Sequence, residues 1–250
     1  MLVISLSAEC PVKKNISLLS NSDPEIRRQA VVTLGRSMNK IAIQPLIKLY
    51  ETEQDIKVYQ AIILSLSFLG GDEVLPILLD VLENDSDLET RRNAAGGLRF
   101  FGDKIKGSEL VDLIIKERDT AIRNVLVGTV IYLRDETLMP KLLALFSTHK
   151  NLELKGCLLE IIGSFDNQQT KDLLIDSIAD DIPEKLRLIA TQSMGKLDDV
   201  KLIPHLYEVY KNDNSSEIVD CAEKILNEYT LLLGYASIDQ MVIDFIKEKQ

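Results

Sequence analysis

The chain has 250 residues, of which 46% are hydrophobic and 27% are charged, and its formal net charge is −10. This balance is typical of a folded globular protein and excludes wholesale disorder. The acidic excess argues against nucleic acid or an anionic membrane as the main partner, because the chain as a whole has no basic surplus to displace counterions.

The N-terminal segment, residues 1–14, has an apolar start. Its lysines, Lys13 and Lys14, follow the apolar run, whereas a secretory signal carries basic residues before it. We therefore expect a strand-like or capping segment here. The longest apolar stretch, Ala61 to Leu69, is interrupted by two serines and is much shorter than the ~20 residues that span a bilayer. These features predict a cytoplasmic protein without a membrane span.

From residue 15 to residue 234, apolar residues recur with a period of 32. Within one unit their spacing is three to four residues, as in Leu78, Val81 and Leu82, which indicates amphipathic helices. One series marks a first helix, A: Leu46, Leu78, Leu110, Leu142, Leu174 and Leu206. Another marks a second helix, B: Leu34, Leu66, Leu98, Val130, Ile162, Met194 and Leu226.

Neither helix of a pair can bury its apolar stripe alone, whereas stacked pairs bury a continuous core. The sequence therefore predicts an all-α protein, an α-solenoid of about seven two-helix repeats. We expect residues 1–250 to form a single domain. In this domain the repeats occupy residues 15–234, and residues 235–250 form a capping end with a final helix near Ile238 to Lys247.

A polar series accompanies the apolar ones. Asp23, Asp55, Asp87, Asp119 and Asn151 are each 32 residues apart. Four residues later the series is Arg27, Tyr59, Arg91, Arg123, Lys155 and Arg187. An Asp at a helix start can accept hydrogen bonds from free N–H groups, and a cation one turn later can pair with it. We expect an Asp–Arg ladder between repeats; the alternative is a ring of arginines that binds anions.

The segment Asp23-Pro-Glu-Ile-Arg-Arg-Gln-Ala-Val-Val-Thr-Leu-Gly-Arg, residues 23–36, resembles the short HEAT-like repeat named after phycobilisome lyases. Segments 41–70 and 85–102 resemble it as well. The resemblance implies HEAT-like repeats over most of the chain, with helix B lining an extended concave surface. It does not imply one function, because such repeats occur in scaffolds, adaptors, bilin lyase subunits and regulatory proteins.

The sequence offers no catalytic or metal-binding motif. It lacks nucleotide-binding glycine loops, His-Glu-x-x-His and Gly-x-Ser-x-Gly. The two histidines, His149 and His205, are isolated, and the three cysteines are far apart. We therefore predict no catalytic residue, no metal ligand and no cofactor.

A departure from the repeat gives the strongest functional hint. At the position of Arg36 the later units carry Phe68, Phe100, Tyr132, Ser164 and Lys196, so three consecutive units place an aromatic residue where the family usually has a polar one. Two interpretations stay open: rings that fill space between repeats, or a strip that binds a partner. The second predicts this set of binding residues: Arg28, Arg36, Tyr59, Phe68, Arg92, Arg99, Phe100 and Tyr132.

Two functions follow as hypotheses. The first is a non-enzymatic scaffold or adaptor that binds a partner protein on its concave face; the acidic balance suits a partner with a basic patch. The alternative, implied by the resemblance, is a bilin lyase-like subunit or a tetrapyrrole-handling chaperone. Its partner would be a tetrapyrrole or a pigment protein, with arginines holding the propionates beside the rings.

Overall fold

The computed structural model of the protein describes residues 11–102 and 104–247, and every regular element in these ranges is helical. The chain divides into two compact units, residues 1–133 (unit 1) and 134–250 (unit 2). A single domain over residues 1–250 therefore stays a prediction. The expected N-terminal segment lies outside the described residues up to residue 10, and from Pro11 onward it is helical.

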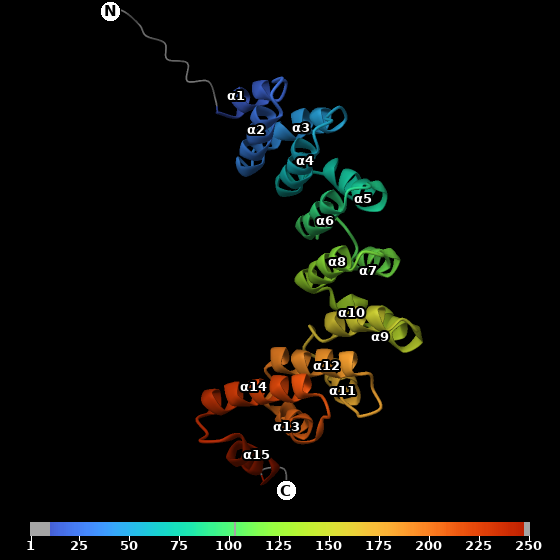
Figure 1. Cartoon of the computed structure of the whole chain (residues 1–250), viewed down its shortest axis with the longest axis vertical. Coiled ribbons are helices and arrows are strands. Elements are labelled where there is room, and N and C mark those ends of the chain that lie inside the picture. Colours follow the sequence, from blue (N-terminus) through green and yellow to red (C-terminus); the bar gives the residue numbers. More distant parts are fainter. Residues whose placement is uncertain (1–10, 103, 248–250) are drawn as a thin grey trace, which may run out of the picture. The chain divides into compact units, whose positions relative to one another are not determined.

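Unit 1 consists of four helix pairs (Figure 1). Its A helices are α1 (Pro11–Leu18), α3 (Ile43–Tyr50), α5 (Val74–Asn84) and α7 (Gly107–Lys116). Its B helices are α2 (Pro24–Arg36), α4 (Ile56–Leu69), α6 (Leu88–Gly97) and α8 (Thr120–Leu133). Two short 3-10 helices complete it, η1 (Lys40–Ala42) and η2 (Leu98–Phe101).

Unit 2 repeats the pattern with three pairs. Its A helices are α9 (Met139–Thr148), α11 (Gln168–Asp176) and α13 (Ile203–Asn212), and its B helices are α10 (Leu152–Ile162), α12 (Glu184–Leu197) and α14 (Ser216–Leu233). The 3-10 helices η3 (Glu136–Leu138) and η4 (Val200–Leu202) precede α9 and α13, and α15 (Ile238–Lys247) ends the unit. The seven pairs confirm the prediction of an all-α solenoid, and α15 matches the expected final helix.

The two 32-residue apolar series form the core of both units. All six leucines of the A series, from Leu46 to Leu206, are fully buried. The B series, from Leu34 to Leu226, is buried to the same degree. Each helix therefore buries one stripe against its own partner and the neighbouring pair, as the period requires.

In unit 1, successive B helices pack directly on one another, α2 on α4, α4 on α6 and α6 on α8, while each A helix packs on its own B helix. Small residues allow this close approach. A Cβ atom on Gly35 would lie 2.6 Å from the Ser65 Oγ, and one on Gly97 would lie 2.7 Å from the Ser67 Cβ. We call the surface formed by the exposed residues of α2, α4, α6, η2 and α8 the B face.

Candidate functional site

The N-terminal ends of the B helices are capped as the polar series predicts. Asp23 accepts a hydrogen bond of 2.9 Å from the Glu25 N–H, and Asp119 accepts one of 2.9 Å from the Ile122 N–H. The equivalent positions do the same at α4, α6 and α10: Asp55, Asp87 and Asn151. Each cap satisfies an N–H group that has no partner within its helix.

The ladder itself differs from the expectation, because the arginines do not pair with the capping residues. Arg27 pairs with Glu53 at 2.6 Å, and the same arrangement recurs twice. Arg91 pairs with Glu117 at 2.5 Å, and Arg187 pairs with Asp213 at 2.8 Å. Each acid lies two residues before the next N-cap. The capping carboxylates are engaged by helix N–H groups, so a second acid receives the guanidinium.

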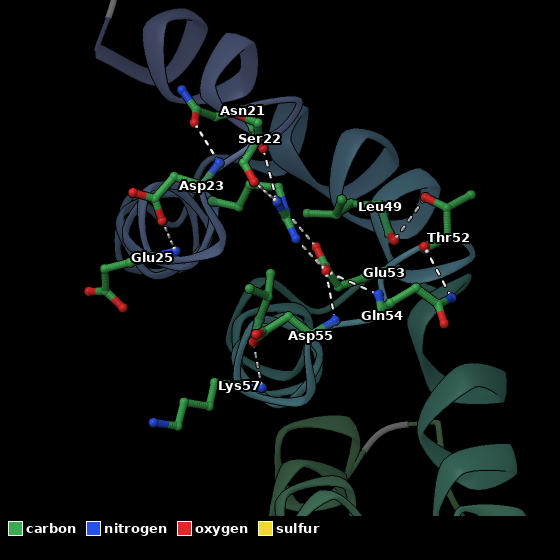
Figure 2. Close-up of polar contacts among 12 residues, drawn as sticks. Asn21, Ser22, Asp23, Glu25, Leu49, Thr52, Glu53, Gln54, Asp55 and Lys57 are labelled. Atoms are coloured by element: carbon green, nitrogen blue, oxygen red, sulfur yellow. Dashed lines mark hydrogen bonds and ion pairs between the residues drawn. The ribbon is translucent and has the colours of Figure 1, made fainter.

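Glu53, the second acid of the first pair, is buried, and both of its carboxylate oxygens accept hydrogen bonds. Figure 2 shows Glu53 at the start of α4, where its Oε1 accepts hydrogen bonds from the Gln54 and Asp55 N–H groups at 3.0 and 2.9 Å. Its side chain is 2% exposed. The hydrogen bonds from Arg27 lower the pKa of Glu53, and those from Arg187 lower the pKa of Asp213. The ladder is therefore a structural network that joins neighbouring repeats.

Tyr59 belongs to this network rather than to the aromatic row. It occupies the arginine position of α4 and stacks on Tyr50, with ring centroids 5.3 Å apart and an interplanar angle of 24°. Burial raises the pKa of Tyr59, with Tyr50 and Asp85 adding to the effect. The structure thus places this predicted binding residue at the ladder end of α4, opposite the end that carries Phe68.

The aromatic row is exposed. Phe68 and Tyr132 lie at the C-terminal ends of α4 and α8, and Phe100 lies in η2 directly after α6; the three keep 41%, 46% and 68% of their surface exposed in the order Phe68, Phe100, Tyr132. The Phe68 and Phe100 rings touch, with centroids 5.3 Å apart, and the Arg99 guanidinium lies 4.8 Å from the Phe100 centroid. In the structure these rings do not fill the core between repeats; Phe101, next to Phe100, does so instead and is 2% exposed.

A groove of about 620 Å³ lies on the B face between α2 and α4. It brings together three of the predicted binding residues: Arg28, Arg36 and Phe68. The other lining residues were not predicted to bind a partner; among them are Lys57, Leu64 and Asn93, and the carboxylate Glu25. Leu64, itself 42% exposed, could have been found because it lies one helical turn before Phe68.

In the next two B helices, the position equivalent to Leu64 carries no side chain. Gly96 and Gly128 occupy the position of Leu64, and a Cβ atom on Gly128 would meet nothing within 4 Å. The helix backbone of α8 is therefore open to contact beside Tyr132. A glycine at such a position permits close approach of another molecule to the helix backbone.

Two carboxylates on the B face each form an ion pair with one arginine. Glu25 pairs with Arg28 at 2.7 Å, and Glu89 pairs with Arg92 at 3.2 Å. The hydrogen bonds from Arg28 lower the pKa of Glu25 to about 2. The Arg92 side chain is 47% exposed on α6 and does not line the groove.

In the described part of the chain, no group of His, Cys, Asp or Glu side chains has an arrangement that could hold a metal ion. None of the helices described there is long and apolar enough to cross a membrane.

Comparisons with known proteins support the architecture. A family model described as HEAT repeats matches residues 12–99 and 43–130. A search of curated proteins finds no match. Among solved structures, the chain is similar to the Escherichia coli protein YibA, at 16% identity and a TM-score of 0.52, with 95% of this chain and 92% of that chain covered.

Two further structures are similar at lower TM-scores. The complex of CpcE and CpcF of phycocyanin lyase from Nostoc sp. PCC7120 gives 18% identity, covers 95% of this chain and 94% of that chain, and has a TM-score of 0.48. Human deoxyhypusine hydroxylase in complex with glycerol gives 14% identity, covers 87% and 84%, and has a TM-score of 0.39. Residues 12–130 therefore match HEAT repeats, and the later helix pairs continue with the same period and the same order of A and B helices.

Proposed function

We propose that this protein is a non-enzymatic scaffold or adaptor that binds a segment of a partner protein on the B face of unit 1. One observation carries the proposal: Phe68, Phe100 and Tyr132 are exposed in a single row, although the residues two positions before them, Leu66, Leu98 and Val130, are fully buried. Exposed aromatic residues beside arginines are enriched at the centres of protein interfaces.

The size of the exposed surface suits this function. Fully burying one large apolar side chain contributes about 1.5–3 kcal/mol, so covering three partly exposed rings and Leu64 is enough for a compact hot spot. The groove between α2 and α4 offers a recess beside the first ring, and Gly128 leaves open backbone beside the last. A partner segment that crosses the B helices would contact all of these features.

The proposal is tested by affinity capture from native cell extract with three baits: the wild type, Phe100→Ala/Tyr132→Ala, and Leu231→Ala as a matched control. Leu231 is exposed and apolar but lies on α14 in unit 2. We expect a partner that the wild type and the control retain and that the double variant loses. The unfolding temperatures of the three baits should differ by only a few degrees, because the removed side chains are all partly exposed. An identical set of captured proteins on all three baits would contradict the proposal.

A tetrapyrrole-handling function is the second candidate. It is favoured by the groove, which places Arg28 and Arg36 beside the exposed Phe68 ring, since a bilin has two propionates and a flat conjugated system. Titration with biliverdin, followed by visible absorption, tests it. A spectral change that Phe68→Ala abolishes would support this function, and an unchanged spectrum of the free pigment would exclude it.

A further inference from the structure

The charge on the B face of unit 1 is opposite to that of the chain as a whole. The chain carries a formal charge of −10. On the described part of the B face, however, the helices carry these cations beside the groove and the row: Arg28, Arg36, Lys57, Arg92 and Arg99. The carboxylates that accompany them are Glu25 and Glu89, so the surface around the rings is locally basic.

Three of these cations form no ion pair with a described carboxylate, although Glu25 lies close enough to Lys57 for an electrostatic interaction. Arg28 and Arg92 are held by Glu25 and Glu89, whereas no described carboxylate forms an ion pair with Arg36, Lys57 or Arg99. All three are exposed.

The capping carboxylates at the border of the face form no ion pair with these cations. Asp55 accepts hydrogen bonds from the first N–H groups of α4. Asp87 accepts from the Thr90 N–H at 2.8 Å and from the Gln60 side-chain amide at 2.9 Å. Their negative charge therefore faces helix N-termini, where the helix dipole already stabilises it.

From this charge pattern we infer that the partner segment bound on the B face is acidic, with carboxylates beside Arg36, Lys57 and Arg99 and apolar side chains against Leu64, Phe68 and Phe100. The inference rests on the proposed function and specifies its partner. An acidic partner segment differs from the partner with a basic patch that the net charge suggested. The local charge of the binding surface, and not the total charge of the chain, determines which ligand it attracts.

The arrangement of the groove explains why charge and rings would act together. Lys57 lies at the N-terminal end of α4, Leu64 and Phe68 follow on the same helix, and Arg36 lies at the C-terminal end of α2. The groove has Lys57 at one end, together with the ion pair of Arg28 and Glu25, and Arg36 at the other end, with an apolar wall between them. An acidic residue on either side of an apolar anchor matches that order, whereas a basic segment would place like charges together.

The experiment is a selection of random phage-displayed peptides on the full chain. We expect enriched peptides to combine net negative charge with aromatic or aliphatic residues. The triple charge reversal Arg36→Glu/Lys57→Glu/Arg99→Glu should weaken their binding about tenfold or more, and raising the salt concentration should weaken binding to the wild type. The matched control is Lys13→Glu/Lys48→Glu/Lys116→Glu, which makes the same charge change on exposed A-helix positions and should leave binding unchanged.

The outcomes separate this inference from the proposed function. Peptides that are neutral or basic, and that are lost on Phe68→Ala/Phe100→Ala but not on the B-face charge reversal, would overturn the acidic partner and leave the scaffold function standing. A selection that yields no peptide dependent on Phe68 and Phe100 would contradict both. Equal weakening by the two charge-reversal variants would show a general charge effect and would also overturn the inference.

Discussion

The two ends of the B helices in unit 1 reverse the usual placement of charged and aromatic residues. At the N-terminal ends, the charged pairs Arg27–Glu53 and Arg91–Glu117 are largely buried. At the C-terminal ends, Phe68 and Phe100 are exposed. Both ends repeat every 32 residues, so periodicity alone does not say which one serves the fold.

The two ends differ in whether their side chains find all their partners within the protein. Each ladder acid has a guanidinium and backbone N–H groups as partners, so the network is closed. The Phe68 and Phe100 rings contact each other, the Arg99 guanidinium lies over Phe100, and the two residues keep 41% and 46% of their surface exposed. A closed network stabilises the stack of repeats, and an open apolar row is available to a partner.

The sharpest way to test this distinction is to compare two adjacent phenylalanines. Phe101→Ala removes a ring that is 2% exposed and should lower the free energy of unfolding by about 3–5 kcal/mol. Phe100→Ala removes a ring that is almost half exposed and should lower it by about 1 kcal/mol or less. Urea unfolding followed by circular dichroism measures both. Equal losses would show that Phe100 is a core residue.

The ladder should be nearly as sensitive as the core. Glu53→Gln keeps the shape of the side chain but leaves the Arg27 guanidinium without a counter-charge, and should cost about 3 kcal/mol of stability. Asp72→Asn is the control, because Asp72 pairs with Lys104 on the surface and should matter little. Urea unfolding compares the two variants. A small effect of Glu53→Gln would mean that the ladder does not hold the repeats together.

Much of the fold could be predicted because it depends on local spacing. The apolar series identified both helices of each pair, and the polar series identified the N-caps, since these depend on residues within one turn. The ladder partner was missed for a physical reason. Glu53 meets Arg27 only because the A helix and its loop return the chain to the start of α4, and a spacing of four residues cannot reveal this.

The site was predicted less completely. The row Phe68, Phe100 and Tyr132 was visible in the sequence, but its exposure depends on where each B helix ends. After Gly97 the chain continues as the 3-10 helix η2, which holds Phe101 inward and leaves Phe100 outward. The groove forms where α2 packs on α4. The sequence alone therefore did not show that Lys57 and Leu64 belong to the site.

Two glycines test the contrast between tightly packed and open positions on the B helices. Their substitution by Ala should change the free energy of unfolding in opposite directions. A Cβ atom on Gly97 would lie 2.7 Å from the Ser67 Cβ, so Gly97→Ala should cost about 1–3 kcal/mol through overpacking. Gly128 has open space around it within α8, so Gly128→Ala should stabilise the protein by about 0.5–1 kcal/mol. Thermal unfolding compares them. Destabilisation by Gly128→Ala would contradict the open surface beside Tyr132.

The smallest expected effect is a pH dependence of stability. It should appear for the ladder at the N-terminal ends of the B helices and not for the rings at their C-terminal ends. Because Arg27 lowers the pKa of Glu53 in the folded state, the stabilisation from this carboxylate is complete above its unfolded pKa of about 4.3 and is lost as the pH falls through the folded value. The stability gap between the wild type and Glu53→Gln should therefore narrow from pH 7 toward pH 3. Phe100→Ala should keep a constant difference from the wild type over the same range, since the ring does not titrate. A gap that stayed constant for Glu53→Gln would mean that its effect comes from shape and packing, and that the charge of the ladder contributes nothing to holding neighbouring repeats.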